Sequence, residues 1–82
     1  MTVLTRPYKK TNPRSVRGAR KRGWHVVKVP ANTLEKHNVS WVGLVMWSTH
    51  KTRGNHVNSY TNREFAFEQV EDASWFTMKW CI

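Results

Sequence analysis

Three things are scarce in this sequence: cysteine, long apolar runs and, in its first third, acidic residues. The one cysteine, Cys81, excludes a disulfide within the chain. The longest apolar run, Trp41–Trp47, has the length of a strand and falls far short of the roughly 20 residues of a membrane-spanning helix. No Asp or Glu precedes Glu35. The start of the chain therefore cannot neutralise its own positive charge.

Positive charge is concentrated where the acidic residues are missing. The formal net charge is +9, and after position 29 the basic residues are balanced by the 5 acidic residues. The surplus therefore belongs to the segment before position 29. A segment that carries one sign of charge is suited to an external polyanion. Its basic residues are Arg6, Lys9, Lys10, Arg14, Arg17, Arg20, Lys21, Arg22 and Lys28.

The length bounds the number of domains. The 82 residues are enough for one small domain and a tail. We expect residues 1–22 to form a basic N-terminal arm and residues 23–82 to form a small aromatic-rich α+β domain. Because no internal disulfide can stabilise so small a domain, aromatic side chains must supply much of its core. The tryptophans all lie in this predicted domain, at positions Trp24, Trp41, Trp47, Trp75 and Trp80.

The predicted arm, residues 1–22, has no hydrophobic period. Pro7 and Pro13 interrupt helical runs, and few large apolar side chains are present. Such a stretch cannot bury enough surface to offset the entropy lost on ordering, so we expect it to be flexible alone and ordered against a partner. Two alternatives stay open, a short strand at Thr2–Thr5 or a turn of helix at Val16–Arg22.

Four segments of the predicted domain give secondary-structure signals. Trp24–Val29 is β-branched and ends at Pro30, which predicts a strand. Asn32 and Glu35 have the spacing of a capping box, which predicts a short helix over Thr33–His37. Further along the chain, alternating phenylalanines predict a strand within Tyr60–Glu68, and helical spacing with acids in the first turn predicts a helix over Val70–Trp80.

The segment Val39–His50 is ambiguous between helix and strand. A helix would place Val39, Val42, Val45 and Met46 on one face. Enrichment in Trp and Val favours a strand, which we predict here. The following stretch, 50–58, has no apolar pattern and is typical of a loop or a wide hairpin turn.

These elements define the predicted fold. Their order is β-α-β-β-α after the arm. Runs of strands with few helices are typical of α+β folds, so we expect a small antiparallel sheet with the helices on one face. The basic arm lies outside this predicted core.

The basic cluster is the strongest functional signal. Closely spaced cations on a pliable backbone can bind nucleic-acid phosphates, and arginine adds forked hydrogen bonds to phosphate. An aromatic residue beside the cluster can stack on bases. The predicted nucleic-acid-binding residues are Lys9, Lys10, Arg14, Arg17, Arg20, Lys21, Arg22 and Trp24. The same cations would also suit an acidic protein or anionic lipid headgroups, or could solubilise the chain without a dedicated partner.

Catalytic and metal-binding motifs are absent from the sequence. The histidines have no tight metal spacing and no cysteine pair to complete a zinc site. His50 and His56 share a segment with Asn55 and Asn58, as in His/Asn nuclease loops, but no carboxylate or base has an assigned place beside them. No Gly-rich phosphate loop or nucleophile elbow is present. We therefore expect no enzyme activity, no metal and no cofactor.

The end of the chain resembles a known group of proteins. Phe65 and Phe67 form an F-x-F strand, and a D-A-x-x-F-x-x-x-W helix pattern falls on Asp72, Ala73, Phe76 and Trp80. In this it resembles small uncharacterised proteins of tailed bacteriophages over about a fifth of the chain. The resemblance implies a phage origin and a strand–helix ending, and no activity. A strand that feeds an amphipathic helix would need the same residue types.

Together these features predict a small non-enzymatic protein that binds nucleic acid non-specifically through a basic arm. The alternatives are a phage-encoded protein that binds and modulates a host protein and a virion structural component. A single free thiol is typical of a reducing compartment, so we expect a cytoplasmic location, in the host if the protein is phage-encoded. Whether the polymer is DNA or RNA does not follow from the sequence.

Overall fold

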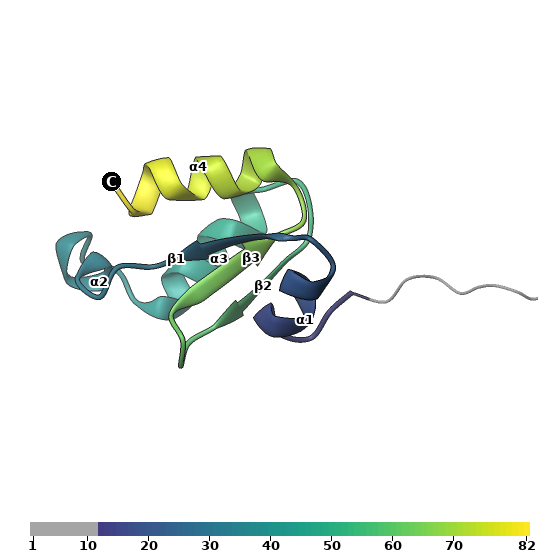
Figure 1. The fold of residues 1–82 in the computed structure, drawn as a ribbon. Coiled ribbons are helices and arrows are strands. Elements are labelled where there is room, and N and C mark those ends of the chain that lie inside the picture. Colours follow the sequence, from purple (N-terminus) through teal and green to yellow (C-terminus); the bar gives the residue numbers. More distant parts are fainter. Residues whose placement is uncertain (1–11) are drawn as a thin grey trace, which may run out of the picture.

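The computed structural model describes residues 12–82, so Lys9 and Lys10 lie outside the described part of the chain. Four helices and three strands are arranged as a three-stranded antiparallel sheet between helices (Figure 1). The prediction of a small α+β fold with an antiparallel sheet is confirmed. In chain order the elements are α1 (Val16–Lys21), β1 (His25–Lys28), α2 (Thr33–Lys36), α3 (Trp41–Lys51), β2 (His56–Ser59), β3 (Glu64–Phe67) and α4 (Val70–Trp80).

The central strand of the sheet is β3, with β1 and β2 on its two sides. In the register, Ala66 of β3 lies opposite Val26 of β1 and Val57 of β2. Side chains alternate along a strand, so Phe65 and Phe67 point to one face and Ala66 to the other. All three are fully buried, which means that both faces of the sheet are covered.

The two faces carry different helices. Phe65 and Phe67 belong to the main apolar core, to which α3 contributes Leu44 and α4 contributes Phe76 and Trp80. On the other face, a second apolar cluster joins Val16 and Ala19 of α1 to Ala66. Figure 1 shows α1 and α4 on opposite sides of the sheet. The prediction that the helices share one face is therefore wrong. The helix on the second face, α1, lies within residues that were predicted to be an arm outside the fold.

The helix α1 lies within the residues predicted as the arm. Val16 and Ala19 of this helix are buried against the sheet, and Pro13 just before it is also buried. The alternative of a helical turn at Val16–Arg22 is confirmed. Within the predicted arm, α1 thus packs onto the sheet, since Val16 and Ala19 form one apolar cluster with Ala66.

The ambiguous segment is the helix α3, and the predicted strand is wrong. Ser40 starts the helix, because its hydroxyl accepts a hydrogen bond from the Gly43 amide at 3.1 Å. Leu44 and Ser48, one turn apart, are its buried residues. Val42 and Met46 of the helical face considered from the sequence are exposed instead. The cap signal at Ser40 outweighs the β-propensity of Trp and Val.

Other predictions are confirmed with adjusted bounds. The strand β1, the short helix α2 and the helix α4 lie where they were expected. The predicted strand Tyr60–Glu68 is confirmed over Glu64–Phe67, and the preceding residues form a turn. The stretch predicted as a loop contains β2 instead. Asn32 makes no side-chain cap hydrogen bond, so the predicted capping box is not formed.

Within residues 12–82, no helix combines the length and the apolar character needed to span a membrane.

Candidate nucleic-acid interface

The helix α1 is held at both ends by capping interactions. At its start the Ser15 hydroxyl accepts a hydrogen bond from the Gly18 amide at 3.1 Å. At its end the Gly23 amide donates to the Arg20 carbonyl and the Trp24 amide donates to the Ala19 carbonyl, each at 3.0 Å. This pair of bonds is a Schellman motif, and it requires the positive φ of 83° at Gly23. The caps fix where a helix of only six residues begins and ends.

The outer side of α1 carries most of the predicted binding residues. Val16 and Ala19 face the sheet with three-residue spacing, so the residues between and after them point away. The structure thus places three cations on α1 itself, Arg17, Arg20 and Lys21, and two beside its ends, Arg14 and Arg22. The exposed basic residues of this cluster, which we call the α1 basic surface, are Arg14, Arg17, Arg20, Lys21 and Arg22.

One carboxylate approaches this surface. The Arg20 guanidinium donates to Glu64 at 3.2 Å, and the Arg20 side chain stays 58% exposed. An ion pair open to water contributes little to stability, about 0–1 kcal/mol, and leaves the cation able to meet another anion. Glu64 therefore directs the Arg20 side chain toward the sheet, while the guanidinium stays accessible to other anions.

Trp24 packs within the fold, as is common for a tryptophan at the start of a strand. Its ring is half-buried and lies against the cluster of Val16, Ala19 and Ala66. The indole therefore closes the apolar contact under α1. The predicted stacking of Trp24 on a base would have to use the part of the ring that this contact leaves exposed.

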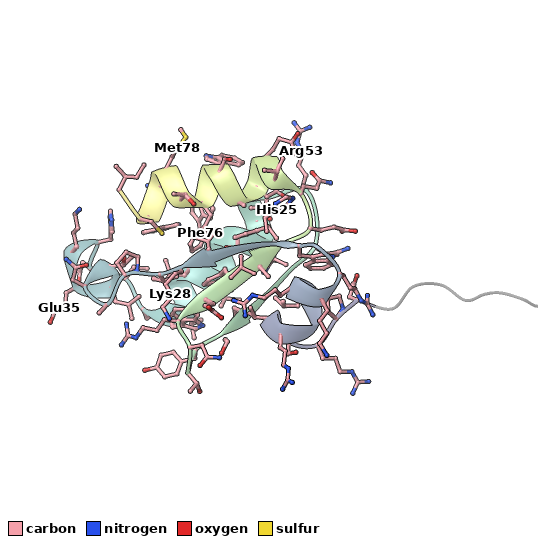
Figure 2. All side chains as sticks on the ribbon, in the orientation of Figure 1. His25, Lys28, Glu35, Arg53, Phe76 and Met78 are labelled. Atoms are coloured by element: carbon pink, nitrogen blue, oxygen red, sulfur yellow. The ribbon has the colours of Figure 1, made fainter. Side chains whose placement is uncertain are left out.

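Two further cations lie at the end of the sheet near the β2–β3 turn. The Lys28 ammonium donates to the Asn62 carbonyl at 3.0 Å. The Arg63 guanidinium donates to the Ala31 carbonyl at 3.3 Å. In the register, Lys28 lies opposite Glu64, so both side chains point to the α1 side of the sheet. Figure 2 shows Lys28 on the opposite side of the fold from Met78, which lies beyond α4.

Sequence reasoning left Lys28 and Arg63 out of the predicted site. They are far apart in the chain and meet only because β1 pairs with β3. A signal was present for Lys28, which follows Val26 at the two-residue spacing of one strand face. No signal pointed to Arg63, which adopts a left-handed conformation, with φ at 55°, in the turn before β3.

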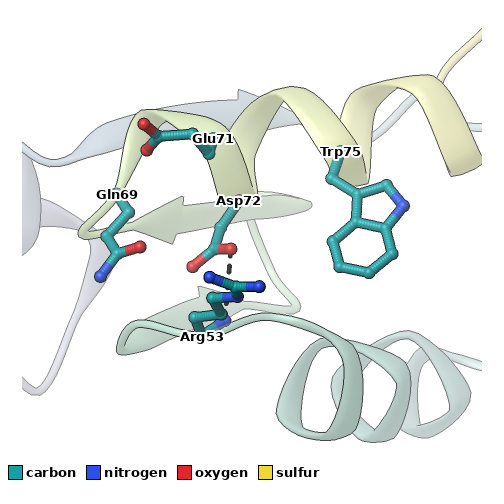
Figure 3. Close-up of a pocket in the computed structure, with 5 residues that line it drawn as sticks. All are labelled: Arg53, Gln69, Glu71, Asp72 and Trp75. Carbon is teal, nitrogen blue, oxygen red and sulfur yellow. Dashed lines mark hydrogen bonds between the residues drawn. The ribbon is translucent and has the colours of Figure 1, made fainter.

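A pocket of about 390 Å³ lies at the start of α4, away from these cations. It is lined by Arg53, Gln69, Glu71, Asp72 and Trp75 (Figure 3). Asp72 is buried, and its two carboxylate oxygens accept from the backbone amides of Arg53 at 3.2 Å and Gly54 at 2.8 Å. Its carboxylate thus ties a loop to α4.

A shallow apolar groove of about 410 Å³ runs between β1 and α4. Its lining residues are Val26, Val27, Ala73, Ser74, Thr77 and Met78. None of these side chains carries a charge or a strong nucleophile.

The histidine segment does not form a nuclease-type site. His50 lies in the last turn of α3 whereas His56 lies in β2, with its ring centroid 6.0 Å from that of Phe67. Burial lowers the pKa of His56, and the nearby Asp72 carboxylate partly opposes that change. Among residues 12–82, no group of three His, Cys, Asp or Glu side chains could hold a metal ion.

Cys81 lies beside β1 rather than in a reactive setting. Its thiol approaches the Lys28 carbonyl at 3.9 Å, and burial raises the pKa of the thiol. A raised pKa lowers the thiolate fraction and with it the nucleophilicity.

Family models, curated proteins and solved structures give no match to this chain. The function must therefore be argued from the residues themselves, and the α1 basic surface is the feature with the clearest chemistry.

Proposed function

We propose that this protein binds nucleic acid non-specifically through the α1 basic surface and catalyses no reaction. The observation that carries the proposal is the two-sidedness of α1. Its apolar side is buried against the sheet, while the five basic residues within it and at its ends are exposed. A helix that merely completed the core would not need so many cations on its outer side.

The chemistry of the surface favours phosphates over bases. Arginine and lysine release counterions when they neutralise phosphates, and this gain is independent of sequence. A helix of six residues offers few positions that could reach base edges. Because α1 is fixed by two caps and an apolar contact, its cations are already close together before the polyanion arrives. Less ordering entropy is then lost on binding than with a flexible arm.

A salt titration tests the proposal. We expect the logarithm of the affinity for a DNA or RNA duplex to fall by about three to five units per tenfold rise in salt, since each neutralised phosphate contributes about 0.9. The double variant Arg14→Gln and Arg17→Gln should reduce this slope by about two. Lys36→Gln on α2, at the far end of the molecule in Figure 1, is the matched control. A slope near zero for the wild type would contradict the proposal.

Substitution is a cleaner test than truncation. If residues 1–22 were only a basic arm, their removal would abolish binding and leave the domain folded. In the structure, that deletion also removes Val16 and Ala19 from the surface around Ala66. The truncated chain would lose apolar cover together with charge, so its loss of binding would have two causes.

The second candidate is a protein partner with an acidic surface, such as a host protein bound by a phage-encoded chain. The observation that favours it is Trp75, which is 46% exposed on α4. Exposed tryptophan is enriched at protein interfaces. A partner that stays bound after nuclease treatment, and that Trp75→Ala releases, would favour this candidate. A virion role would require the protein in purified particles.

A further inference from the structure

The sheet has a free edge at β1. Among the strands of the described chain, the order β1-β3-β2 gives β1 a single neighbour, β3. The Val29 amide donates to the Arg63 carbonyl at 2.8 Å, and hydrogen-bonded pairs alternate along an antiparallel ladder. In the observed register, Val27 therefore bonds to β3, whereas the N–H and C=O groups of Val26 point away from β3. Such an unpaired edge is a template for another strand.

The groove between β1 and α4 follows this edge. Val26 and Val27 point to opposite faces of the sheet, so a groove lined by both lies along the side of the strand. Its other wall is the flank of α4 that carries Ser74 and Met78. Met78 is 67% exposed, and Val70, one turn before Ser74 on the same flank, is 51% exposed. The groove thus combines unpaired backbone groups with an uncovered apolar helix flank.

Charge limits what can cover the groove. No charged side chain lines it, although the chain carries a formal net charge of +9. The exposed charged residues of α4, Glu71 and Lys79, are not among the lining residues, and α1 with its cations lies on the other face of the sheet. Two copies of the chain can therefore meet along this groove without bringing charges of the same sign into contact.

The spacing of the elements fits a second copy. The helix α4 packs over both β1 and β3. If two β1 strands pair antiparallel about a two-fold axis, the strand spacing of about 4.8 Å places the two α4 helices about 10 Å apart. Packed helices lie about 8–10 Å apart, so one arrangement completes both the sheet and the helix layer. The helices run antiparallel, with Val70 of one copy near Met78 of the other, and their dipoles attract.

We propose that two copies of this chain form a two-fold dimer in which the β1 strands pair antiparallel and the α4 helices pack across the seam. This inference goes beyond the proposed function and does not depend on it. A register centred on Val26 keeps the two Lys28 side chains from lying opposite each other. Because a two-fold axis perpendicular to a sheet keeps each face on its own side, both α1 basic surfaces lie on one face of the dimer.

Sedimentation velocity over a range of protein concentrations measures the dimer. Because β1 is short, the interface lies at the small end of protein contacts, and we expect a dissociation constant of about 1–100 μM. Two copies with a formal net charge of +9 repel each other, so the dimer should become tighter as salt screens that repulsion. Nucleic-acid binding through phosphates has the opposite salt dependence.

Two variants act on the two halves of the seam. Val26→Pro removes an outward N–H that β3 does not use, and an edge strand tolerates proline at such a position. Met78→Lys brings a cation from each copy into the seam. Each should raise the dissociation constant at least about tenfold. Met46→Lys, at a 53% exposed position of α3 outside the groove, is the matched control and should change it less than about twofold. Circular dichroism checks that the three variants fold.

Amide hydrogen exchange tests the strand pairing itself. The Val26 amide should exchange several-fold more slowly at a protein concentration that favours the dimer than at one that favours the monomer. The Asn58 amide points away from β3 at the other edge of the sheet, so its exchange should not depend on concentration. Protection of both amides, or of neither, would contradict pairing through β1.

The outcomes separate this inference from the proposed function. A wild type that stays monomeric at about 1 mM overturns the inference and leaves the groove to another occupant, such as another protein or the N-terminal residues of the chain. A dimer that both variants leave intact lies on another surface and overturns it as well. A dimer that dissociates as salt rises is bridged by nucleic acid, which also overturns it. None of these results changes the salt titration of nucleic-acid binding, which tests the proposed function separately.

Discussion

The two faces of the sheet differ in how deeply they are covered. On one face, α3 and α4 bury large rings, among them Phe65, Phe67 and Phe76. On the other, α1 contributes two small apolar side chains, and its outer surface is basic. Since apolar burial contributes about 25 cal/mol per Å² of surface, most of the stability must come from the aromatic face. The α1 face can therefore carry charge at little cost to the stability of the fold.

The largest expected effect tests the aromatic face. Phe76 is fully buried, with its ring 4.7 Å from Phe65 and 5.2 Å from Phe67. Phe76→Ala should lower the free energy of unfolding by about 3–5 kcal/mol, because it leaves a cavity among these rings. Urea denaturation followed by tryptophan fluorescence measures the change. A loss of less than about 1 kcal/mol would mean that the rings do not form the main core.

The next effect concerns the loop that joins α3 to the sheet. Asp72→Ala removes the acceptor of two backbone amides, those of Arg53 and Gly54, and should lower the free energy of unfolding by about 2–3 kcal/mol. Glu71→Ala, at an exposed position in the same helical turn, is the matched control and should cost only about 0.3–1 kcal/mol through the helix dipole. If urea denaturation showed equal losses of unfolding free energy for the two variants, Asp72 would act only through the helix dipole.

A smaller effect tests the α1 face. Val16→Ala removes apolar contact with the sheet and should cost about 1–2 kcal/mol. Because α1 rests on a small patch, we expect the loss to appear as local opening of this helix. Hydrogen exchange should show faster exchange of the α1 amides, such as Ala19, with β3 nearly unchanged. Equal acceleration in α1 and β3 would show that the two faces unfold as one unit.

The same contrast explains which elements could be predicted from the sequence. The strand around Phe65 and the helix α4 carry strong periodic signals and large side chains, and both were predicted correctly. The helix α1 has only Val16 and Ala19 as its buried residues. Two apolar residues in so short a segment do not define a helical period, so the pattern cannot be told from that of a coil. Its packing depends on Ala66, a partner distant in the sequence.

The prediction for the segment that forms α3 was wrong for a different reason. Its sequence mixes β-branched and aromatic residues, whose intrinsic preference is for strands. The cap at Ser40 and the absence of a side chain at Gly43 decide the outcome. A Cβ added at Gly43 would lie 2.5 Å from a methyl carbon of Val39, so this first turn needs glycine. Such a close approach is visible only in three dimensions.

The basic residues of the candidate site were identified from the sequence, but their arrangement on the surface was not. The basic residues from Arg14 to Arg22 were identified from charge alone, since no acidic residue lies among them. That Arg17, Arg20 and Lys21 share a fixed helix depends on the contact with the sheet, and that Lys28 lies on the same side of the sheet depends on strand pairing. Charge can be counted along a sequence, whereas its arrangement on a surface follows from the fold.

The smallest expected effect is a loss of stability in acid that arises at His56 on the aromatic face. The ring of His56 packs near Phe65 and Phe67, its Nδ1 atom is buried without a hydrogen-bond partner in the structure, and burial lowers its pKa in spite of Asp72. An unfolded histidine titrates near pH 6.5, so the unfolded chain takes up a proton before the folded one does. The stability that depends on neutral His56 is therefore present above about pH 6.5 and is lost as the pH falls through the lower folded pKa.

Urea denaturation between about pH 5 and pH 8 measures this loss. The wild type should become less stable toward acid, and His56→Gln, which cannot titrate, should lose less over the same range. His50→Gln, at the exposed end of α3, keeps the wild-type dependence because that side chain lies outside the core. The apolar contact under α1 contains no titratable side chain, so the acid effect should be confined to the aromatic face. Parallel pH profiles for the wild type and His56→Gln would show that His56 is solvated in both states.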